Sequence, residues 1–332
     1  MATTFTTATN AASNREDLAN FISNIVRDDT PFTSSCGRAK ATAILHEWST
    51  DELQPPAANN NAEGAAFPGT PSTGPIVARL NNKTQIFTKS IEVSGTMENV
   101  SKAGRKSEFK YQSEKRGKEL MRDIEWALTT GKGVKSSSGN RVMGGYQSWV
   151  KAANTVNASG GAITDGAGDG SNVPASAGSA AAFTLSQVDS VMQAAWENGG
   201  RPTTLMMSPR LKRSFSTAAQ GQVSNGNVRR NIDESGKLRQ SVEIYETDFG
   251  VVQVVPNYIM GHTGSGAGAA NAAADDNILV YDSSMFKLAT LRPLHHRDIS
   301  EDGDRLRALM VHETTLECLN PSASGLVDNL SG

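Results

Sequence analysis

The sequence predicts an α+β fold, and three stretches carry that prediction. Residues 107–130 have the pattern of one long charged helix, while residues 76–80 and 84–94 are rich in residues that favour strands. Residues 184–215 then follow the order helix, buried strand, helix. Strands and helices in this order predict a mixed α+β body.

Composition sets limits on the function. The 332 residues include 32 Lys and Arg against 34 Asp and Glu, so the chain lacks the basic footprint of a protein that grips nucleic acid by charge. Two distant cysteines, Cys36 and Cys318, fit no zinc or disulfide pattern, and we expect buried free thiols in a reducing compartment. No apolar run approaches the roughly 20 residues of a membrane span, and the first 14 residues do not resemble a signal peptide.

Residues 1–75 are expected to form an N-terminal arm with one anchor. Within it, residues 15–27 predict a short amphipathic helix, and residues 42–48 a strand. Residues 54–75 are dense in Pro, Gly and Asn and predict an extended segment. The apolar face of the amphipathic helix consists of Leu18, Phe21, Ile22, Ile25 and Val26.

A long β-hairpin is the natural interpretation of the next stretch. Residues 76–80 and 84–94 would be its strands, and the Asn-rich residues 81–83 its turn. Both sides of the second strand mix apolar and polar residues. Since a solitary hairpin is marginal in water, we expect it to lie against this subunit or a neighbouring one.

The long helix over residues 107–130 would run about 36 Å at 1.5 Å per residue. Its other faces are charged, with spacings that allow Lys110–Glu114 and Glu114–Lys118 pairs. On composition alone, a solvated helix of an ordinary domain is the favoured interpretation of this pattern. Its apolar stripe is narrow and comprises Phe109, Ser113, Gly117, Leu120, Ile124 and Leu128.

The remainder predicts a mixed body with loops rich in Gly and Ala. Residues 152–183 should be a surface excursion, and Thr184 with Gln187 should form a capping box that opens a helix. We expect a polar tail after the last strand. The expected strands cover residues 203–207, residues 241–260 with a turn at 248–250, residues 278–281 and residues 305–319, and a helix with Ser208 as its N-cap follows the first of them.

Motifs for catalysis are weak. The Asp248–Phe249–Gly250 tripeptide of kinases lacks every accompanying kinase motif, so it predicts a turn. His295 and His296, with Asp302 nearby, allow a surface cation site and hence a metal-dependent enzyme as an alternative. Neighbouring residues of an extended segment point to opposite sides, which disfavours that alternative. We therefore predict no catalytic, cofactor-binding or metal-binding residue.

The chain resembles the major capsid proteins of tailed bacteriophages, which have the Hong Kong ninety-seven capsid fold. The order of arm, hairpin, long helix and mixed body matches that fold, and specific segments resemble one phage capsid family. The resemblance extends from residue 15 to about residue 327, except for the loops at residues 152–183 and 261–277. The segments include REDLANFISNIVRDDTPF, HEWSTDEL, AGRKSEFKYQSEKRGKELMRDIEWAL, RVMGGYQSW, RPTTLMMSP, YETDFGVVQVVPN and LRPLHHRDISEDGDRLRALMVHETTLECLNPSA.

The resemblance implies a division of the chain into the parts of a capsid subunit. Residues 1–75 would be the N-arm, residues 76–100 the hairpin called the E-loop, and residues 101–150 the spine helix of the peripheral P-domain with the segment after it. Residues 151–290 would be mainly the axial A-domain. Residues 291–332 would return to the P-domain as a strand and tail.

The implied function is that of a structural shell subunit. Hexamers and pentamers of the chain would enclose double-stranded DNA in an icosahedral head, assembled in the host cytoplasm. Scaffolding, portal and decoration proteins would be its partners, with non-specific contacts to DNA. From the charged residues of the expected hairpin we take Arg79, Lys83, Lys89 and Glu92 as candidate intersubunit contacts. A cellular nanocompartment of the encapsulin type, with the same fold, is the alternative that a cargo-binding pocket would reveal.

Overall fold

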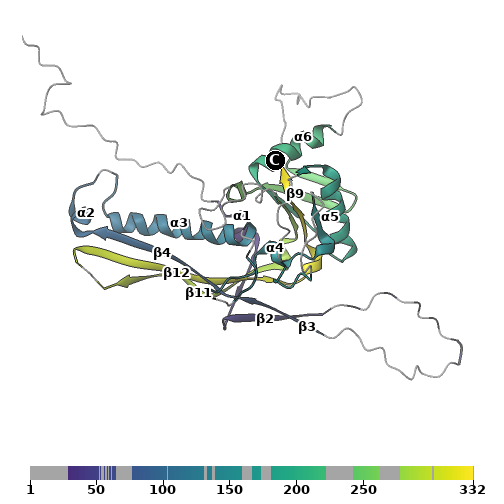
Figure 1. The fold of residues 1–332 in the computed structure, drawn as a ribbon, viewed down its shortest axis with the longest axis horizontal. Helices are drawn as coiled ribbons and strands as arrows, with labels where there is room; N and C mark the ends of the chain where they lie inside the picture. Colours follow the sequence, from purple (N-terminus) through teal and green to yellow (C-terminus); the bar gives the residue numbers. More distant parts are fainter. Residues whose placement is uncertain are drawn as a thin grey trace, which may run out of the picture.

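The structure is a computed structural model, and it describes residues 29–51, 77–102, 104–130, 133–136, 139–158, 167–172, 181–221, 242–261, 277–300 and 303–331, with parts of residues 53–64. A compact body lies at one end, and a thin two-layered projection extends from it (Figure 1). The amphipathic helix expected over residues 15–27 lies outside the described residues.

A four-stranded sheet with the order β1-β11-β12-β4 runs from the body into the projection. β1 pairs in parallel with β11, while β12 lies antiparallel between β11 and β4. The long helix α3 covers one face of this sheet (Figure 1). The strands are β1 (Gly37–Lys40), β4 (Gln85–Ser94), β11 (Phe286–Ile299) and β12 (Arg305–Cys318).

Helix α3 (Glu108–Thr129) confirms the expected long helix almost to the residue. Its N-cap is Ser107, whose hydroxyl oxygen accepts a hydrogen bond from the Lys110 backbone N–H at 3.2 Å. The stripe is also confirmed in its C-terminal half, where Leu120, Ile124 and Leu128 are fully buried. They pack in a core that also contains side chains of β4 and β12.

The body is built on a six-stranded sheet with the order β5-β13-β10-β7-β9-β8. Helices α5 and α6 pack on one face, and the other face packs against the core shared with α1 and α3. The strands and helices are β5 (Thr155–Asn157), β7 (Thr204–Met207), β8 (Ile244–Thr247), β9 (Gly250–Pro256), β10 (Ile278–Tyr281), β13 (Gly325–Asp328), α5 (Leu185–Glu197) and α6 (Pro209–Gly221).

Local signals in the body are confirmed. α5 opens with the Thr184–Gln187 capping box, and the α6 N-cap Ser208 accepts a hydrogen bond from the Leu211 backbone N–H at 3.3 Å. β8 and β9 form the expected hairpin, which turns at Asp248 and Phe249. Shorter elements are α2 (Gly95–Asn99), α4 (Tyr146–Trp149), β6 (Ala181–Ala182), β14 (Leu330–Ser331) and the 3₁₀ turns η2 (Ala152–Asn154), η3 (Ile259–Gly261), η4 (Ser283–Met285) and η5 (Pro321–Ala323).

The hairpin expected over residues 76–94 is wrong. β3 (Ala78–Lys83) pairs with β2 (Leu45–Thr50), whereas β4 pairs with β12. Residues 81–83 do not turn, because they lie within β3 and pair with residues 45–47 of β2. The Asn82 side chain is buried and donates a hydrogen bond to the Leu316 carbonyl at 2.7 Å. The chain therefore passes from one sheet into the next without reversing.

The expected arm over residues 1–75 is wrong for its described C-terminal part. Helix α1 (Pro31–Ser35) and strands β1 and β2 belong to the folded subunit. Phe32 of α1 is fully buried against the rings of Tyr146, Tyr281 and Phe286, with centroids 5.2–5.9 Å apart. Phe32 thus helps to anchor a segment whose composition suggested an extended arm.

The polar tail expected after residue 319 is also wrong. β13 lies between β5 and β10 inside the six-stranded sheet, and all its residues are buried. The expected surface excursion over residues 152–183 likewise contributes β5 and the buried Asn154, whose amide donates to the Ser324 carbonyl at 3.0 Å. Sequence analysis missed these elements because strands of three or four residues give too short a pattern.

Two further expectations concern cysteines and membranes. Cys36 and Cys318 are buried free thiols, as predicted. Burial raises the pKa of Cys36 to about 12, so it stays a thiol at neutral pH. Among the helices in the described ranges, none has the length and apolar content needed to cross a membrane.

Candidate assembly surfaces

The first candidate surface is the projection, which we call the tongue. It comprises residues 85–118 and 292–311, apart from residues 103, 301 and 302, which lie outside the described part. Every residue from Arg292 to Ser300 is exposed, although β11 pairs with β12 along its length. β1 pairs only with residues 287–290 of β11, so among the described strands the outer part of β11 forms an edge of the sheet.

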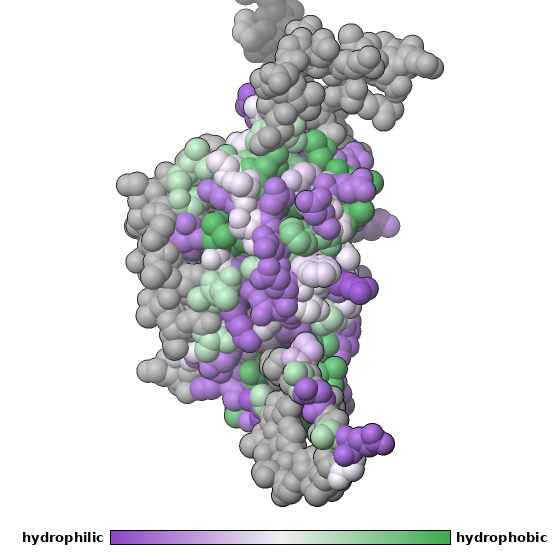
Figure 2. All heavy atoms as spheres, turned by 90° about the vertical axis from the view of Figure 1, so that its right-hand side faces the viewer, coloured by the Kyte–Doolittle hydropathy of each residue, from purple (hydrophilic) through white to green (hydrophobic). Residues whose placement is uncertain are grey.

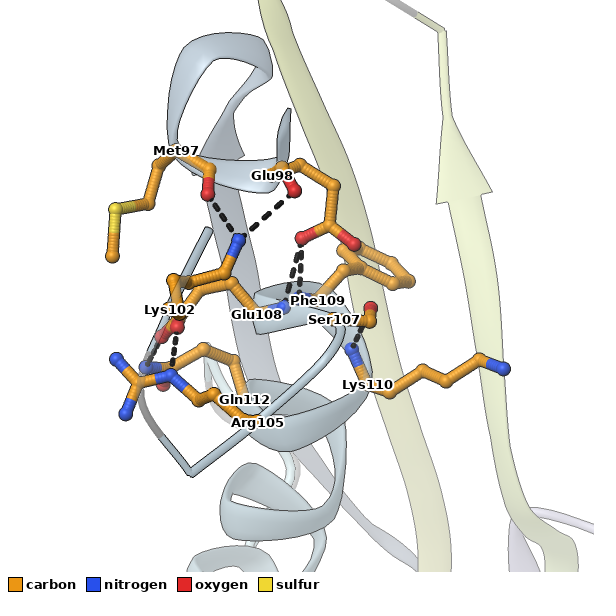
Figure 3. A network of polar contacts seen from close by, with 9 residues as sticks. All are labelled: Met97, Glu98, Lys102, Arg105, Ser107, Glu108, Phe109, Lys110 and Gln112. Atoms are coloured by element: carbon orange, nitrogen blue, oxygen red, sulfur yellow. Dashed lines mark hydrogen bonds and ion pairs between the residues drawn. The ribbon is translucent and has the colours of Figure 1, made fainter. Parts of the chain in front are cut away.

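A network of polar contacts links α2 to the first turns of α3 at the tip of the tongue (Figure 3). The Glu98 carboxylate accepts hydrogen bonds from the backbone N–H groups of Glu108 (2.9 Å) and Phe109 (3.1 Å), at the N-terminus of α3. Lys102 donates to the carbonyl of Glu98 at 2.9 Å and so closes the end of α2. The hydrogen bond to the Ser107 side chain, together with those N–H groups, lowers the pKa of Glu98.

A second set of contacts ties the loop before α3 to its first turns. Arg105 pairs with the Glu108 carboxylate, which also accepts a hydrogen bond from Gln112 at 2.7 Å. Burial alone would raise the pKa of Glu108. The hydrogen bonds from Gln112 and Arg105 lower it by more, so the pKa lies below its usual value. The tip is therefore a fixed polar surface, suited to docking against another subunit without rearrangement.

The hairpin of β2 and β3 is the second protruding feature. The hairpin is fixed to the body towards the end where Leu45 pairs with Lys83. Trp48 donates to the Cys318 carbonyl at 2.8 Å, and its ring centroid lies 5.3 Å from that of Trp149. His46 lies 3.1 Å from the Glu317 carboxylate. The other end, where Thr50 pairs with Ala78, leads into residues 51–77.

The candidate contact residues lie on both features. Arg79 is on the hairpin, 3.6 Å from Glu47, with 72% of its side chain exposed. Lys83 is half-buried at the end of β3, where its backbone N–H donates to the Asn82 side chain at 2.8 Å. Arg79 is therefore well placed to meet a neighbouring molecule, whereas Lys83 lies beside the body.

The other two candidates belong to the tongue, where each has a partner in its own subunit. Lys89 of β4 forms a 2.6 Å ion pair with Asp123 of α3. Glu92 pairs with Arg305 of β12 at 2.6 Å, and Arg307 lies 3.8 Å away. The structure thus separates the four residues that sequence analysis had placed on one hairpin.

Sequence analysis missed a buried carboxylate where α1, α3 and the body meet. Glu125 is fully buried, and it accepts hydrogen bonds from the backbone N–H groups of Phe32 (2.8 Å) and Thr33 (2.7 Å) and from the Asn257 amide (2.8 Å). Burial raises the pKa of Glu125, while these donors and the Thr33 hydroxyl oppose that shift. The one sequence feature that could have predicted the burial of Glu125 is its position beside the apolar stripe of α3.

A second buried carboxylate, Glu313 of β12, fixes the base of the tongue. It pairs with Arg141 at 2.8 Å and Arg292 at 2.6 Å and accepts a hydrogen bond from the Thr84 hydroxyl at 2.8 Å. Burial raises the pKa of Glu313, but Thr84 and the two arginines outweigh it and hold that pKa below its usual range. The contact joins the β3–β4 junction, β11 and the segment before α4.

The residues of the alternative metal site do not converge. The Nδ1 atom of His295 lies 2.8 Å from the Pro293 carbonyl, and His296 is 3.9 Å from Asp298. Asp302 lies outside the described part of the chain. Within that described part, no group of three or more His, Cys, Asp or Glu residues is arranged to hold a metal ion.

The surface of the body is mixed in character. On the face that Figure 2 shows, separate hydrophobic patches alternate with hydrophilic ones. The large apolar residues most exposed in the described body are Trp196, Ile244 and Val251. A subunit with a tongue, a protruding hairpin and scattered apolar patches is built for many small contacts.

Comparison with known proteins identifies the family. The family model for the SU10 major capsid protein matches residues 1–331. The chain belongs to the SU10 major capsid protein family. Its fold is that of tailed-phage capsid proteins, as the resemblance implied. A curated major capsid protein of Escherichia phage Phieco32 is 36% identical over 114 residues, and this match spans 34% of the chain and about a third (32%) of that relative.

Solved structures share the fold at low identity. A chain from Mycobacterium phage Bobi aligns with a TM-score of 0.62 at 15% identity, covering 98% of this chain and 99% of its own. The capsid of a native GTA particle aligns with a TM-score of 0.61 at 12% identity, covering 98% of both chains. The SrpI encapsulin from Synechococcus elongatus PCC 7942 aligns less closely, with a TM-score of 0.55 at 10% identity over 96% of this chain and 93% of its own.

Proposed function

We propose that this chain is the shell subunit of a phage head, forming hexamers and pentamers around double-stranded DNA. Membership of a major capsid protein family supports this proposal most directly. The same fold occurs in an encapsulin, but the family match and the higher TM-scores of the phage and GTA structures favour a virion over a nanocompartment. The shell would assemble in the host cytoplasm.

The two protruding features support a lattice because they lie at opposite ends of one path. The chain runs through β3 and then β4, from the Thr50–Ala78 end of the hairpin to the tip of the tongue at Ser94 (Figure 1). Seventeen residues at about 3.3 Å each span roughly 55 Å. Contacts between different surfaces at opposite ends of a subunit repeat from copy to copy, which generates rings and closed shells.

The parts of the subunit follow from this arrangement. The tongue would be the P-domain, the body around the six-stranded sheet the A-domain, and β2, β3 and residues 51–77 the E-loop. The proposed E-loop therefore differs from the one expected from the sequence, which covered residues 76–100. Arg79, Lys83, Lys89 and Glu92 remain proposed intersubunit contacts, with Arg79 favoured by its exposure. Exposed ion pairs contribute about 0–1 kcal/mol each, so multiplicity and not any single pair would stabilise the shell.

The proposed shell would have protein partners and would enclose DNA. Scaffolding, portal and decoration proteins would bind the assembled shell, and the packaged DNA would be contacted without sequence preference. A net charge of −2 suits a container that must release its DNA. We propose no catalytic activity for the chain.

Shortening the protruding hairpin tests the lattice. Residues 54–75 are replaced by a short Gly/Ser linker, which leaves the Thr50–Ala78 pair able to close the hairpin. We expect the variant to fold with an unchanged thermal midpoint for the isolated subunit and to form no closed particles by electron microscopy. Particles that assemble and survive heating like those of the unaltered chain would refute the proposed role.

A further inference from the structure

The face of the six-stranded sheet that packs against α1 and α3 is only partly covered. Met206 of β7 and Leu279 of β10 are buried in the same core as Phe32 of α1. Val255 of β9 packs against this core, but it is only half-buried. The layer formed by α1 and α3 therefore reaches β9 and ends there.

Beyond Val255 the same face is exposed. Side chains alternate along a strand, so Val251 and Gln253 of β9 share the face of Val255. Ile244 pairs with Gln253, and Glu246 pairs with Val251, which places these four residues on one surface. Ile244 is 66% exposed and Val251 57%, whereas Val252 and Val254 on the opposite face are buried beneath α5 and α6. We call this surface the β8–β9 face.

The chain that precedes α1 begins beside this surface. Phe32 of α1 and Asn257, which directly follows β9, bind the same Glu125 carboxylate. Residues 29 and 30 therefore lie near the Pro256 end of β9 and on the side of the sheet that α1 covers. The preceding residues 15–27 carry five apolar side chains at helical spacing, which need an apolar partner surface.

The length and charge of residues 15–27 also match those of the β8–β9 face. A helix of 13 residues is about 20 Å long, and β9 from Gly250 to Pro256 spans about the same length. With residue 27 beside the Pro256 end, Arg15 would come near Glu246 at the other end of the β8–β9 face. We propose that residues 15–27 fold back as an amphipathic helix and cover the β8–β9 face of their own subunit. This inference is independent of the shell proposal.

Disulfide trapping in the full chain tests the contact. Ile22→Cys is combined with Val251→Cys, and the control combines Ile22→Cys with Val100→Cys on the tongue. Val100 is 55% exposed, so the two partner sites are matched in accessibility. The natural thiols Cys36 and Cys318 are buried and should not compete. Oxidised glutathione is the oxidant, and non-reducing electrophoresis with peptide mass mapping is the readout.

The expected product is a disulfide between residues 22 and 251 within one chain, formed at least tenfold faster than in the control. A covalent dimer through the same two positions would overturn the proposal, because the occupant would then be a second copy. Equal rates in the test and control pairs would overturn it as well.

Hydrogen exchange of the otherwise unaltered chain provides a second measurement. Val251→Asp should speed exchange of residues 15–27 about tenfold, as expected when the burial of one valine-sized side chain is lost, while α5 peptides stay protected. Val100→Asp should leave residues 15–27 unchanged. Exchange of residues 15–27 that is equally fast in the unaltered chain and in Val251→Asp would contradict the proposal.

Discussion

Glu125 holds α1, α3 and the body together through one buried carboxylate. Glu125→Ala leaves two backbone N–H groups, the Thr33 hydroxyl and the Asn257 amide without their acceptor in a fully buried place. We expect a loss of about 3 kcal/mol in the free energy of unfolding, measured by urea denaturation of the subunit. Glu114→Ala on the same helix, with 76% of the side chain exposed, should change it by about 0.5 kcal/mol or less. Equal midpoints for the two variants would contradict this role.

His312 should make the stability depend on pH. Burial within the four-stranded sheet lowers the pKa of His312, and the charges of Arg38 on β1 and His295 on β11 lower it further. Below its ordinary value of about 6.5 the unfolded chain binds a proton that the folded chain resists, so stability is present above that pH and is lost as the pH falls.

The measurement compares urea midpoints of the unaltered chain and His312→Gln between pH 7.5 and 5.5. The decline on acidification should be smaller in the variant, because glutamine does not titrate. His296→Gln is the control, since that side chain is 57% exposed. An identical decline in the unaltered chain and His312→Gln would show that another group is responsible.

At the scale of elements, the β2–β3 hairpin should be held by its aromatic base. Trp48→Ala removes the hydrogen bond to the Cys318 carbonyl and the packing against Trp149. We expect amides of β2 and β3 to exchange at least tenfold faster while those of α5 are unchanged, by hydrogen exchange with mass spectrometry. Arg79→Ala, which removes only an exposed ion pair, should have little effect on the same amides. Uniform acceleration throughout the subunit would instead mean that Trp48 supports the whole fold.

Elements with a long or capped pattern could be predicted from the sequence. The 22-residue helix α3, the capping box of α5 and the β8–β9 hairpin each have local signals that tertiary contacts reinforce. The pairing of β3 could not be predicted, because the burial of Asn82 depends on its hydrogen bond to Leu316, more than 200 residues away in sequence. β13 was missed for a similar reason, since its partners β5 and β10 come from distant parts of the chain.

The candidate contacts show the same limit. Composition identified charged residues between 79 and 92, and the structure distributes them over the hairpin, the body and the tongue. Lys89 and Glu92 meet partners on α3 and β12 that only the folded chain brings near. The buried carboxylates Glu125 and Glu313 gave no sequence signal because isolated glutamates are usually on the surface.

At the scale of the whole molecule, an elongated subunit with different surfaces at its two ends requires neighbours. The tongue is held rigid by Glu98 at its tip and Glu313 at its base, so it would dock as a preformed unit. The hairpin emerges at the other end of the path through β3 and β4 (Figure 1). The chain belongs to the SU10 major capsid protein family. In a closed shell of such subunits, the tongue and the hairpin of every copy would both contact neighbouring copies.

Electron microscopy of the purified, recombinant full-length chain tests the central claim most directly. The account predicts closed icosahedral shells, or rings of six and five subunits, at concentrations where copies meet often. The hairpin-shortened chain, with residues 54–75 replaced, serves as the assembly-deficient control. A chain that folds with the stability expected of its core but stays monomeric at high concentration would contradict the claim that it is a shell subunit.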